Sequence, residues 1–88
     1  MKTHYLKITQ EYFLAKLQGI KPFEVRINDR EYEIGDILVL HELNEDMECT
    51  GRTITQSVNY KFENPDYLQK GYVILSGEII AIEFSKVF

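Results

Sequence analysis

A lysine, a glutamate and an arginine stand close together within the first third of the chain. Lys21 comes just after a predicted helix, and Glu24 and Arg26 are two residues apart in a predicted strand. Alternate residues of a strand share one face at a separation of ~6.6 Å. An arginine fork and a lysine ammonium that converge on one hollow can hold a phosphate, while the glutamate orients the arginine or accepts a hydrogen bond from a base. The alternative is an exposed Glu–Arg pair worth about 0–1 kcal/mol.

Other basic and aromatic side chains can extend this group. Lys7 and Arg30 can widen a basic surface, although Asn28-Asp29-Arg30 also suits an ordinary turn. Tyr5, Tyr12 and Tyr32 offer rings on which an unpaired base can stack, or they pack in the core or at its rim. The predicted ligand-binding or nucleic-acid-binding residues are Lys7, Lys21, Glu24, Arg26, Asn28 and Arg30.

The histidines and the single cysteine do not form a metal motif. His4, His41 and Cys49 are far apart in the chain, and the spacing of zinc ligands is absent. The acidic stretch 42–48 lacks the alternating ligands of a calcium loop and is expected to be a solvated hairpin end. We find neither a readable Ser-His-Asp arrangement nor a glycine-rich phosphate loop. The sequence therefore predicts no metal and no cofactor.

Charge is divided unevenly along the chain, although the net charge is −4. Residues 1–30 carry six basic and three acidic side chains, a sum of +3, and residues 31–66 carry two basic and nine acidic ones, a sum of −7. Separated charge of this kind can steer an anion to one face of an acidic protein. It is equally compatible with an ordinary solvated surface.

Length and composition limit the chain to a single domain, residues 1–88. With 44% hydrophobic and 27% charged residues, it has an ordinary globular composition. The longest purely apolar runs have four residues, far below the ~20 that a membrane helix needs. The N-terminus lacks the apolar segment of a secretory signal. One cysteine cannot form an internal disulfide, which favours a reduced, cytoplasmic setting.

Periodicity predicts one helix and about six strands. The helix follows a capping Thr9, buries Phe13 and Leu17, and ends at Gly19 after about three turns. The alternation that starts at Phe23 predicts a half-buried strand. The expected strands are 4–8, 23–27, 37–43, 52–60, 71–76 and 79–84. We therefore expect an α+β fold, a small mixed β-barrel whose closure removes exposed edges, capped by the helix after the first strand.

The segment around the Lys–Glu–Arg group resembles a known family. A helix ending in Leu17-Gln18-Gly19, then Ile20-Lys21-Pro22 and a strand reading Phe23-Glu24-Val25-Arg26, looks like the signature of the ASCH domain (activating-signal-cointegrator homology) of the PUA-like superfamily. Further pieces are similar to a short, largely uncharacterised bacterial and phage branch: His4–Lys7, Tyr12–Phe13, Asn28–Arg30, Gly35–Asp36, Thr50–Arg52 and Gly71–Leu75. The resemblance implies a small barrel with a cleft between helix and barrel that binds RNA or modified nucleotides.

Three functions from different classes remain open. The first is a binding module for RNA or a nucleotide-like ligand. The second follows from the resemblance, because some small ASCH proteins are amidohydrolases that remove an acyl group from a modified cytidine, with a lysine that matches Lys21. Those enzymes have a threonine where this chain has Glu24, which is a departure from their pattern. Under this alternative the catalytic residues are Lys21 and Glu24. The third is a phage-related protein-interaction module that uses a barrel edge or the acidic 42–48 hairpin.

Overall fold

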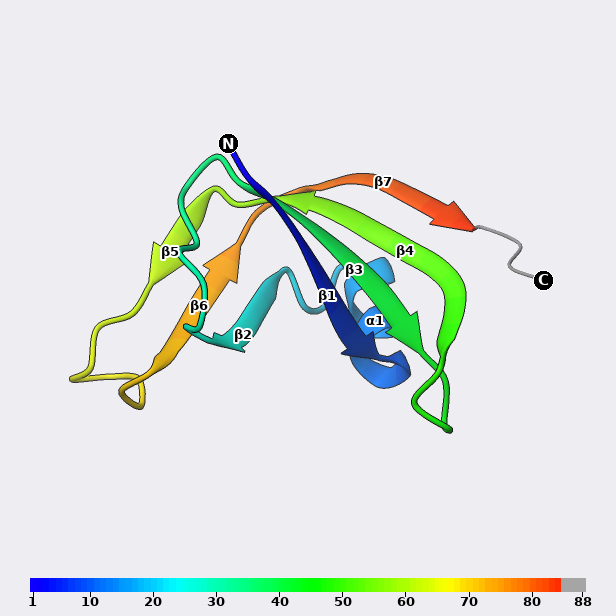
Figure 1. Ribbon diagram of the computed structural model, residues 1–88, viewed down its shortest axis with the longest axis horizontal. Coiled ribbons are helices and arrows are strands. Elements are labelled where there is room, and N and C mark those ends of the chain that lie inside the picture. The colour runs from blue at the N-terminus through cyan, green and yellow to red at the C-terminus, as the bar shows by residue number, and fades with distance from the viewer. Residues whose placement is uncertain (85–88) are drawn as a thin grey trace.

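The computed structural model describes residues 1–84, which form one helix and seven strands (Figure 1). The elements are β1 (Thr3–Thr9), α1 (Gln10–Leu17), β2 (Phe23–Ile27), β3 (Ile37–Leu43), β4 (Cys49–Ser57), β5 (Tyr60–Phe62), β6 (Tyr72–Ser76) and β7 (Ile79–Phe84). The α+β class and the position of the helix after the first strand are confirmed.

The strands pair in two sheets, of order β1-β3-β4-β7 and β2-β6-β5. β1 and β3 are parallel, and every other pair is antiparallel. Figure 1 shows the three-stranded sheet at one end of the long axis and β7 reaching toward the other. The hydrogen bonds of residues 1–84 therefore do not close the predicted barrel, because each sheet keeps its own two edge strands.

The predicted strand 52–60 is two strands, and this break raises the count from six to seven. Val58 is buried, and its backbone N–H bonds the carbonyl of Asp36 at 2.9 Å instead of a sheet neighbour. On either side, the N–H of Ser57 bonds Glu78 and that of Asn59 bonds Ser76. The chain thus leaves the four-stranded sheet after β4 and enters the three-stranded one at β5.

The core lies between the two sheets and α1. It contains side chains from β1, α1, β3, β4, β6 and two loops: Leu6, Ile8, Phe13, Tyr32, Leu38, Leu40, Ile54, Val58, Val73 and Leu75. Six buried polar or charged side chains need partners within the protein, since an unpaired buried charge is costly. They are His4, Lys16, Glu24, Asp36, Glu42 and Gln56, each no more than 6% exposed.

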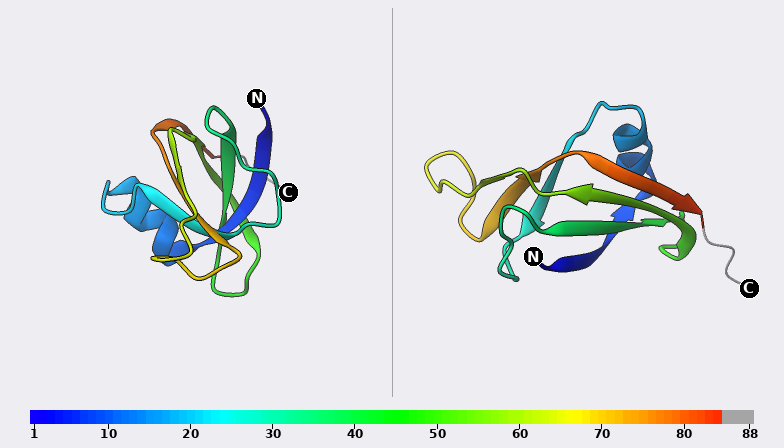
Figure 2. Two further views of the ribbon diagram at one scale, coloured as in Figure 1. Left: turned by 90° about the vertical axis from the view of Figure 1, so that its left-hand side faces the viewer. Right: turned by 90° about the horizontal axis from the view of Figure 1, so that it is seen from above.

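α1 is shorter than predicted, with eight residues, and its end has the predicted left-handed glycine. Gly19 has φ +74°, and its N–H bonds the carbonyl of Lys16 while the N–H of Ile20 bonds that of Ala15. This Schellman pattern folds the chain back over the last helical turn. Figure 2 shows the turn after α1 leading directly into β2. No helix among residues 1–84 has the length and apolar character to cross a membrane.

β2 is half-buried as predicted, but its buried half is the charged one. Glu24 is 2% exposed, whereas Phe23, Val25 and Ile27 are 40%, 46% and 61% exposed. The strand pairs with β6 so that Glu24 lies opposite Leu75 and Arg26 lies opposite Val73, both fully buried. The alternation in the sequence is real, but the polar residues face inward and the apolar residues face out.

Candidate functional site

The carboxylate of Glu24 is the centre of a cationic cluster. Its Oε1 accepts a hydrogen bond from Lys21 Nζ at 3.2 Å and lies 3.3 Å from Lys16 Nζ. Its Oε2 accepts from Arg26, with Nε at 3.0 Å and Nη2 at 2.8 Å. Three cations from the helix, the Schellman turn and β2 therefore surround one buried carboxylate.

Lys16 is the innermost of these cations and was not among the predicted site residues. Its side chain is 1% exposed, and its ammonium also donates to Gln56 Oε1 at 2.7 Å and to the backbone carbonyl of Lys21 at 3.3 Å. Burial lowers the pKa of Lys16, while the nearby Glu24 carboxylate raises it in partial compensation. Lys16 does not line the cavity described below, and its contacts hold the turn and the carboxylate in place.

Lys21 occupies the boundary between this cluster and the surface. Its ammonium donates to the carbonyl of Phe23 at 2.9 Å and to Glu24, and it lies 4.9 Å and 5.1 Å from the ring centroids of Tyr12 and Phe23. The two rings and the carboxylate fix the cation in one position. Its side chain is 16% exposed, and that of Arg26 is 21% exposed, so both heads reach solvent.

A cavity of about 660 Å³ opens beside these two heads. That volume lies within the ~300–1,000 Å³ typical of small-molecule sites. Its walls combine an apolar part with charged groups: Lys7, Ile8, Thr9, Glu11, Tyr12, Ala15, Ile20, Lys21, Phe23, Glu24, Val25 and Arg26. Lys7, Lys21 and Arg26 outnumber Glu11 and Glu24, which leaves a surplus of one positive charge, or two with Lys16 behind the wall. Such a cavity can accept a ligand that has a flat apolar part and an anionic group.

The structure separates the predicted binding residues into two groups. Lys7, Lys21, Glu24 and Arg26 line the 660 Å³ cavity. Asn28 and Arg30 lie outside it: Asn28 donates to Glu63 at 2.9 Å, and Arg30 lines an adjoining hollow of about 330 Å³. Arg26 and Val25 belong to both spaces, so the hollow continues the cavity along β2.

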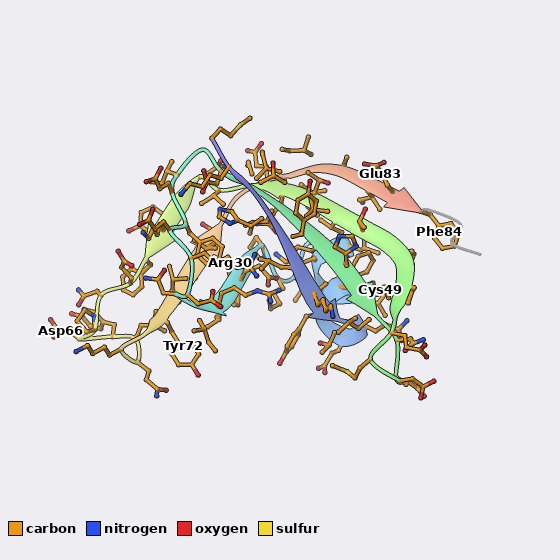
Figure 3. The ribbon with its side chains drawn as sticks, viewed as in Figure 1. Arg30, Cys49, Asp66, Tyr72, Glu83 and Phe84 are labelled. Atoms are coloured by element: carbon orange, nitrogen blue, oxygen red, sulfur yellow. The ribbon has the colours of Figure 1, made fainter. Side chains whose placement is uncertain are left out.

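Tyr72 forms the far side of that hollow. Figure 3 labels it at the start of β6, together with Arg30. Of the three tyrosines proposed for stacking, Tyr12 is in the cavity wall. Tyr5 is exposed and lies near His41, with ring centroids 6.3 Å apart. Tyr32 is 1% exposed and packs on His4, so the stacking hypothesis is wrong for Tyr32.

Lys16 and Gln56 complete the cluster, and the sequence contained a signal for each. Lys16 stands three residues after Phe13 and next to Leu17, in phase with the buried stripe of the helix. Gln56 lies between Ile54 and Val58 in the period of two, on the inward face of β4. A polar residue at an inward-facing position of a helix or strand needs a buried partner. Lys16 and Gln56 are such partners for each other.

The residues of the cluster lie within the part of the chain that matches a protein-family model. Residues 3–77 match the model of a domain of unknown function, DUF3850, which includes every residue of the cluster. The chain is also 37% identical over 84 residues to an "Uncharacterized 12.9 kDa protein in GpA 3'region" of Escherichia phage P2, covering 92% of this chain and 75% of that protein. The chain therefore belongs to the DUF3850 family and is related to a phage protein.

Proposed function

We propose that this protein is a binding module for RNA or a nucleotide-like ligand, with the 660 Å³ cavity as its site. The observation that carries the proposal is the arrangement of Lys21 and Arg26 on the two oxygens of one buried carboxylate, at the wall of a cavity with exposed apolar sides. We also propose that the family is a distant relative of the ASCH domain, on the strength of residues 17–26. A cytoplasmic location suits the exposed free thiol of Cys49.

The polar part of the site suits a phosphate. Glu24 neutralises at most one of the three cations around it, and both exposed heads remain available as donors. Arginine offers a planar fork and lysine a point charge, and hydrogen bonds between ionised partners are about twice as strong as neutral ones. Glu24 holds both cations in position before a ligand arrives, which reduces the entropy lost on binding.

The apolar part suits a base. Tyr12, Ile20, Phe23 and Val25 are 40% to 70% exposed, which is unusual for large side chains grouped at one cavity. Aromatic and aliphatic surface next to a phosphate site is the combination that single-strand binders use, with stacking worth about 1–3 kcal/mol per base. A nucleotide provides both a flat base and an anion.

The test is direct binding with charge-removing variants. A labelled short single-stranded RNA and a labelled nucleotide are titrated with protein at several salt concentrations, and fluorescence anisotropy is measured. Lys21→Met and Arg26→Met keep the apolar stem, and each is expected to weaken binding about tenfold, since a charge-assisted contact to phosphate is lost. Lys70→Met is the matched control, because Lys70 is an exposed lysine outside both cavities.

Salt dependence distinguishes a phosphate site from general stickiness. For single strands the logarithm of affinity falls with the logarithm of salt concentration by about 0.7 for each phosphate neutralised. Engagement of Lys21 and Arg26 therefore predicts a slope near −1.4, reduced by about half in either Met variant. If neither probe binds at low salt, or both variants bind like wild type, the proposal is wrong.

A second candidate is an amidohydrolase, favoured by the 3.2 Å contact between Lys21 Nζ and Glu24 Oε1 at the cavity wall. In this reaction Lys21 takes a proton from water, the hydroxide attacks the acyl carbon, and Lys21 returns the proton to the cytidine amino group as the carbon–nitrogen bond breaks. Incubation with acetylated cytidine should release acetate, and Lys21→Ala should abolish the release. Release of acetate by neither protein would remove this candidate and leave the binding proposal untouched.

A further inference from the structure

The outer face of the three-stranded sheet carries an unusual set of side chains. Directly opposed residues of an antiparallel sheet have side chains on the same face, so the pairing defines three rows across β2, β6 and β5. The rows are Phe23–Ser76–Tyr60, Val25–Ile74–Phe62 and Ile27–Tyr72. The inner face has Glu24, Arg26, Val73 and Leu75 instead. The outward apolar side of β2 is thus one edge of a larger apolar and aromatic surface, which we call the outer face.

This outer face is open in the part of the chain that the structure describes. Tyr60 is 60% exposed and Ile27 61%, and Phe23 and Val25 are about half as exposed as free side chains. Phe23, Tyr60, Phe62 and Tyr72 make no ring–ring contact with each other or with another aromatic residue among residues 1–84. Phe23 and Tyr60 are exposed, and Phe62 and Tyr72 are half-buried. Because none of the four rings is stacked on another, their exposed parts are open to a ligand.

The first row contains a gap between two rings. Ser76 lies in the middle strand, with Phe23 and Tyr60 directly opposite it on the two flanking strands. Adjacent strands are ~4.8 Å apart, so a flat ring placed over the small Ser76 side chain would be ~4.8 Å from each flanking residue. Stacked aromatic rings have centroids ~4.5–7 Å apart. The gap therefore has the width that one base needs between two rings.

Cations follow the edge of this face along β2. The 660 Å³ cavity combines Lys21 and Arg26 with Phe23 and Val25 of the outer face. The adjoining hollow combines Arg26 and Arg30 with Val25, Ile27 and Tyr72 of the same face, and Asp29, 3.7 Å from Arg30 Nε, leaves it a surplus of one positive charge. Basic side chains therefore lie along the β2 edge of the apolar surface from the first row to the third. The sugar–phosphate backbone of a bound strand would lie along this edge.

We propose that the outer face is a stacking platform for successive bases of a single-stranded RNA, with one base inserted over Ser76 between Phe23 and Tyr60. The inference rests on the proposed function and extends it: the ligand is a strand of several nucleotides, not a mononucleotide. Lys21, Arg26 and Arg30 bind its phosphates along β2, and Phe62 and Tyr72 receive neighbouring bases. The rings and the cationic edge together favour RNA, because a nucleotide strand brings a flat base for the rings and a phosphate for the cations at every step.

The experiment compares oligonucleotides with mononucleotides in two variants of the first row. Tyr60→Ser removes one wall of the gap, and Ser76→Tyr fills the gap with a third ring. Each should weaken binding of a short single-stranded RNA about tenfold, the effect of one lost base stack, and leave mononucleotide binding at the cavity unchanged. Ser76→Tyr should also melt no lower than wild type, because it adds cross-strand ring contacts, so loss of binding cannot be ascribed to unfolding.

Two controls isolate stacking. Tyr67→Ser changes a tyrosine that is 82% exposed but lies between β5 and β6 along the chain, outside the sheet, and should bind RNA like wild type. An abasic oligomer of equal length presents the same phosphates without bases, so its weaker binding should be insensitive to Tyr60→Ser and Ser76→Tyr.

The outcomes separate this proposal from the one on which it rests. If wild type binds RNA and both first-row variants bind it equally well, the platform is wrong while the cavity proposal stands. If sedimentation shows a dimer of the free protein that Tyr60→Ser converts to a monomer, the outer face is a protein interface and the platform is overturned. If wild type binds neither RNA nor nucleotide, both proposals fall together.

Discussion

Two buried glutamates in this protein have opposite surroundings. Glu42 is 1% exposed and accepts hydrogen bonds from Arg52 at both oxygens, from Thr50 at 2.6 Å and from Gln10 at 3.4 Å. Glu24 is 2% exposed and is contacted by Lys16, Lys21 and Arg26. One carboxylate has a single cation and neutral donors, and the other has three cations, two of which reach a cavity.

The comparison supports a structural role for Glu42 and the proposed ligand-binding role for the cluster around Glu24. Around Glu42 charge is balanced, and the Arg52 guanidinium lies over the ring of Phe13 at 5.1 Å, so the group links β3, β4 and α1. Around Glu24 positive charge exceeds negative charge, a state that a folded protein keeps at a cost in stability. An excess of charge beside a cavity is better explained by a ligand that balances it than by the fold.

The largest expected effect is the removal of the one cation at Glu42. Arg52→Met leaves a buried carboxylate with neutral donors only, and breaking a buried pair in this way costs about 3–5 kcal/mol, toward the lower end here because Arg52 is one-third exposed. Arg26→Met should cost about 1 kcal/mol or less, since Glu24 keeps Lys16 and Lys21. Urea unfolding of both variants with unchanged m-values measures the difference. Equal losses would contradict the distinction between the two clusters.

Acid should weaken the fold by protonating two buried carboxylates, Asp36 and Glu42, whose pKa values are lowered in the folded state. The pKa of Asp36 falls to about 2, because hydrogen bonds from His4 and from the backbone of Lys2 and Glu33 outweigh its desolvation by burial. Because its pKa is lowered from 3.8, the ionised Asp36 adds about 2 kcal/mol to the free energy of unfolding above pH 3.8. This contribution is lost as the pH falls toward 2. The hydrogen bonds of Arg52 lower the pKa of Glu42 in the same direction.

Asp36→Asn tests this acid limb. The variant should be less stable than wild type near neutral pH and should approach it at low pH, because the neutral amide has no proton to gain. Free energies of unfolding from urea titrations across this range measure the convergence. A constant difference at every pH would show that the Asp36 charge has no part in acid unfolding.

The sequence predicted most of the helix and strand positions, but it did not predict which face of β2 is buried. The helix, its glycine cap and the strands 37–43 and 79–84 follow from local periodicity and turn residues, which the chain carries by itself. The face of β2 that is buried depends on tertiary pairing: Lys16, itself held by Gln56, is a buried partner for Glu24, against the preference of Phe23 and Val25 for the core. The split of strand 52–60 likewise depends on Asp36, a residue far away in sequence.

The site was predictable where its residues are close in sequence and not where they are distant. Lys21, Glu24 and Arg26 lie within six positions, so strand geometry alone brings them together. Gln56 is forty residues from Lys16, and the contact between them exists only after β4 has paired with its neighbours. Arg30 could not be placed from the sequence either, because the path of the loop after β2 decides where it lies, and the number of residues between Arg26 and Arg30 does not.

A smaller effect is expected at Lys16, with a pH dependence of the same sign as that of Asp36 but in an alkaline window. Burial lowers the pKa of Lys16 below 10.5, so the folded state holds fewer protons than the unfolded state between the lowered value and 10.5. Stability should therefore rise with pH across this window. Lys16→Met removes the rise and should change stability near neutral pH by no more than about 1 kcal/mol, because the methionine fills similar volume without a charge. A large loss would show that Lys16 is the required counter-ion of Glu24.

The smallest effect, and the sharpest test of the charge argument, is expected for Gln56→Glu. Gln56 Oε1 accepts from Lys16 at 2.7 Å, while Gln56 Nε2 is buried without a partner among residues 1–84. Glutamate keeps the acceptor, removes the unpartnered donor and gives Lys16 its own anion, which offsets the cost of burying a second carboxylate, so stability should change by no more than about 1 kcal/mol. The surplus positive charge near the cavity falls by one, so RNA should bind a few-fold more weakly, although Gln56 is too buried to touch it. A variant that keeps its stability and binds RNA as tightly as wild type would show that the excess charge around Glu24 is not what attracts the ligand.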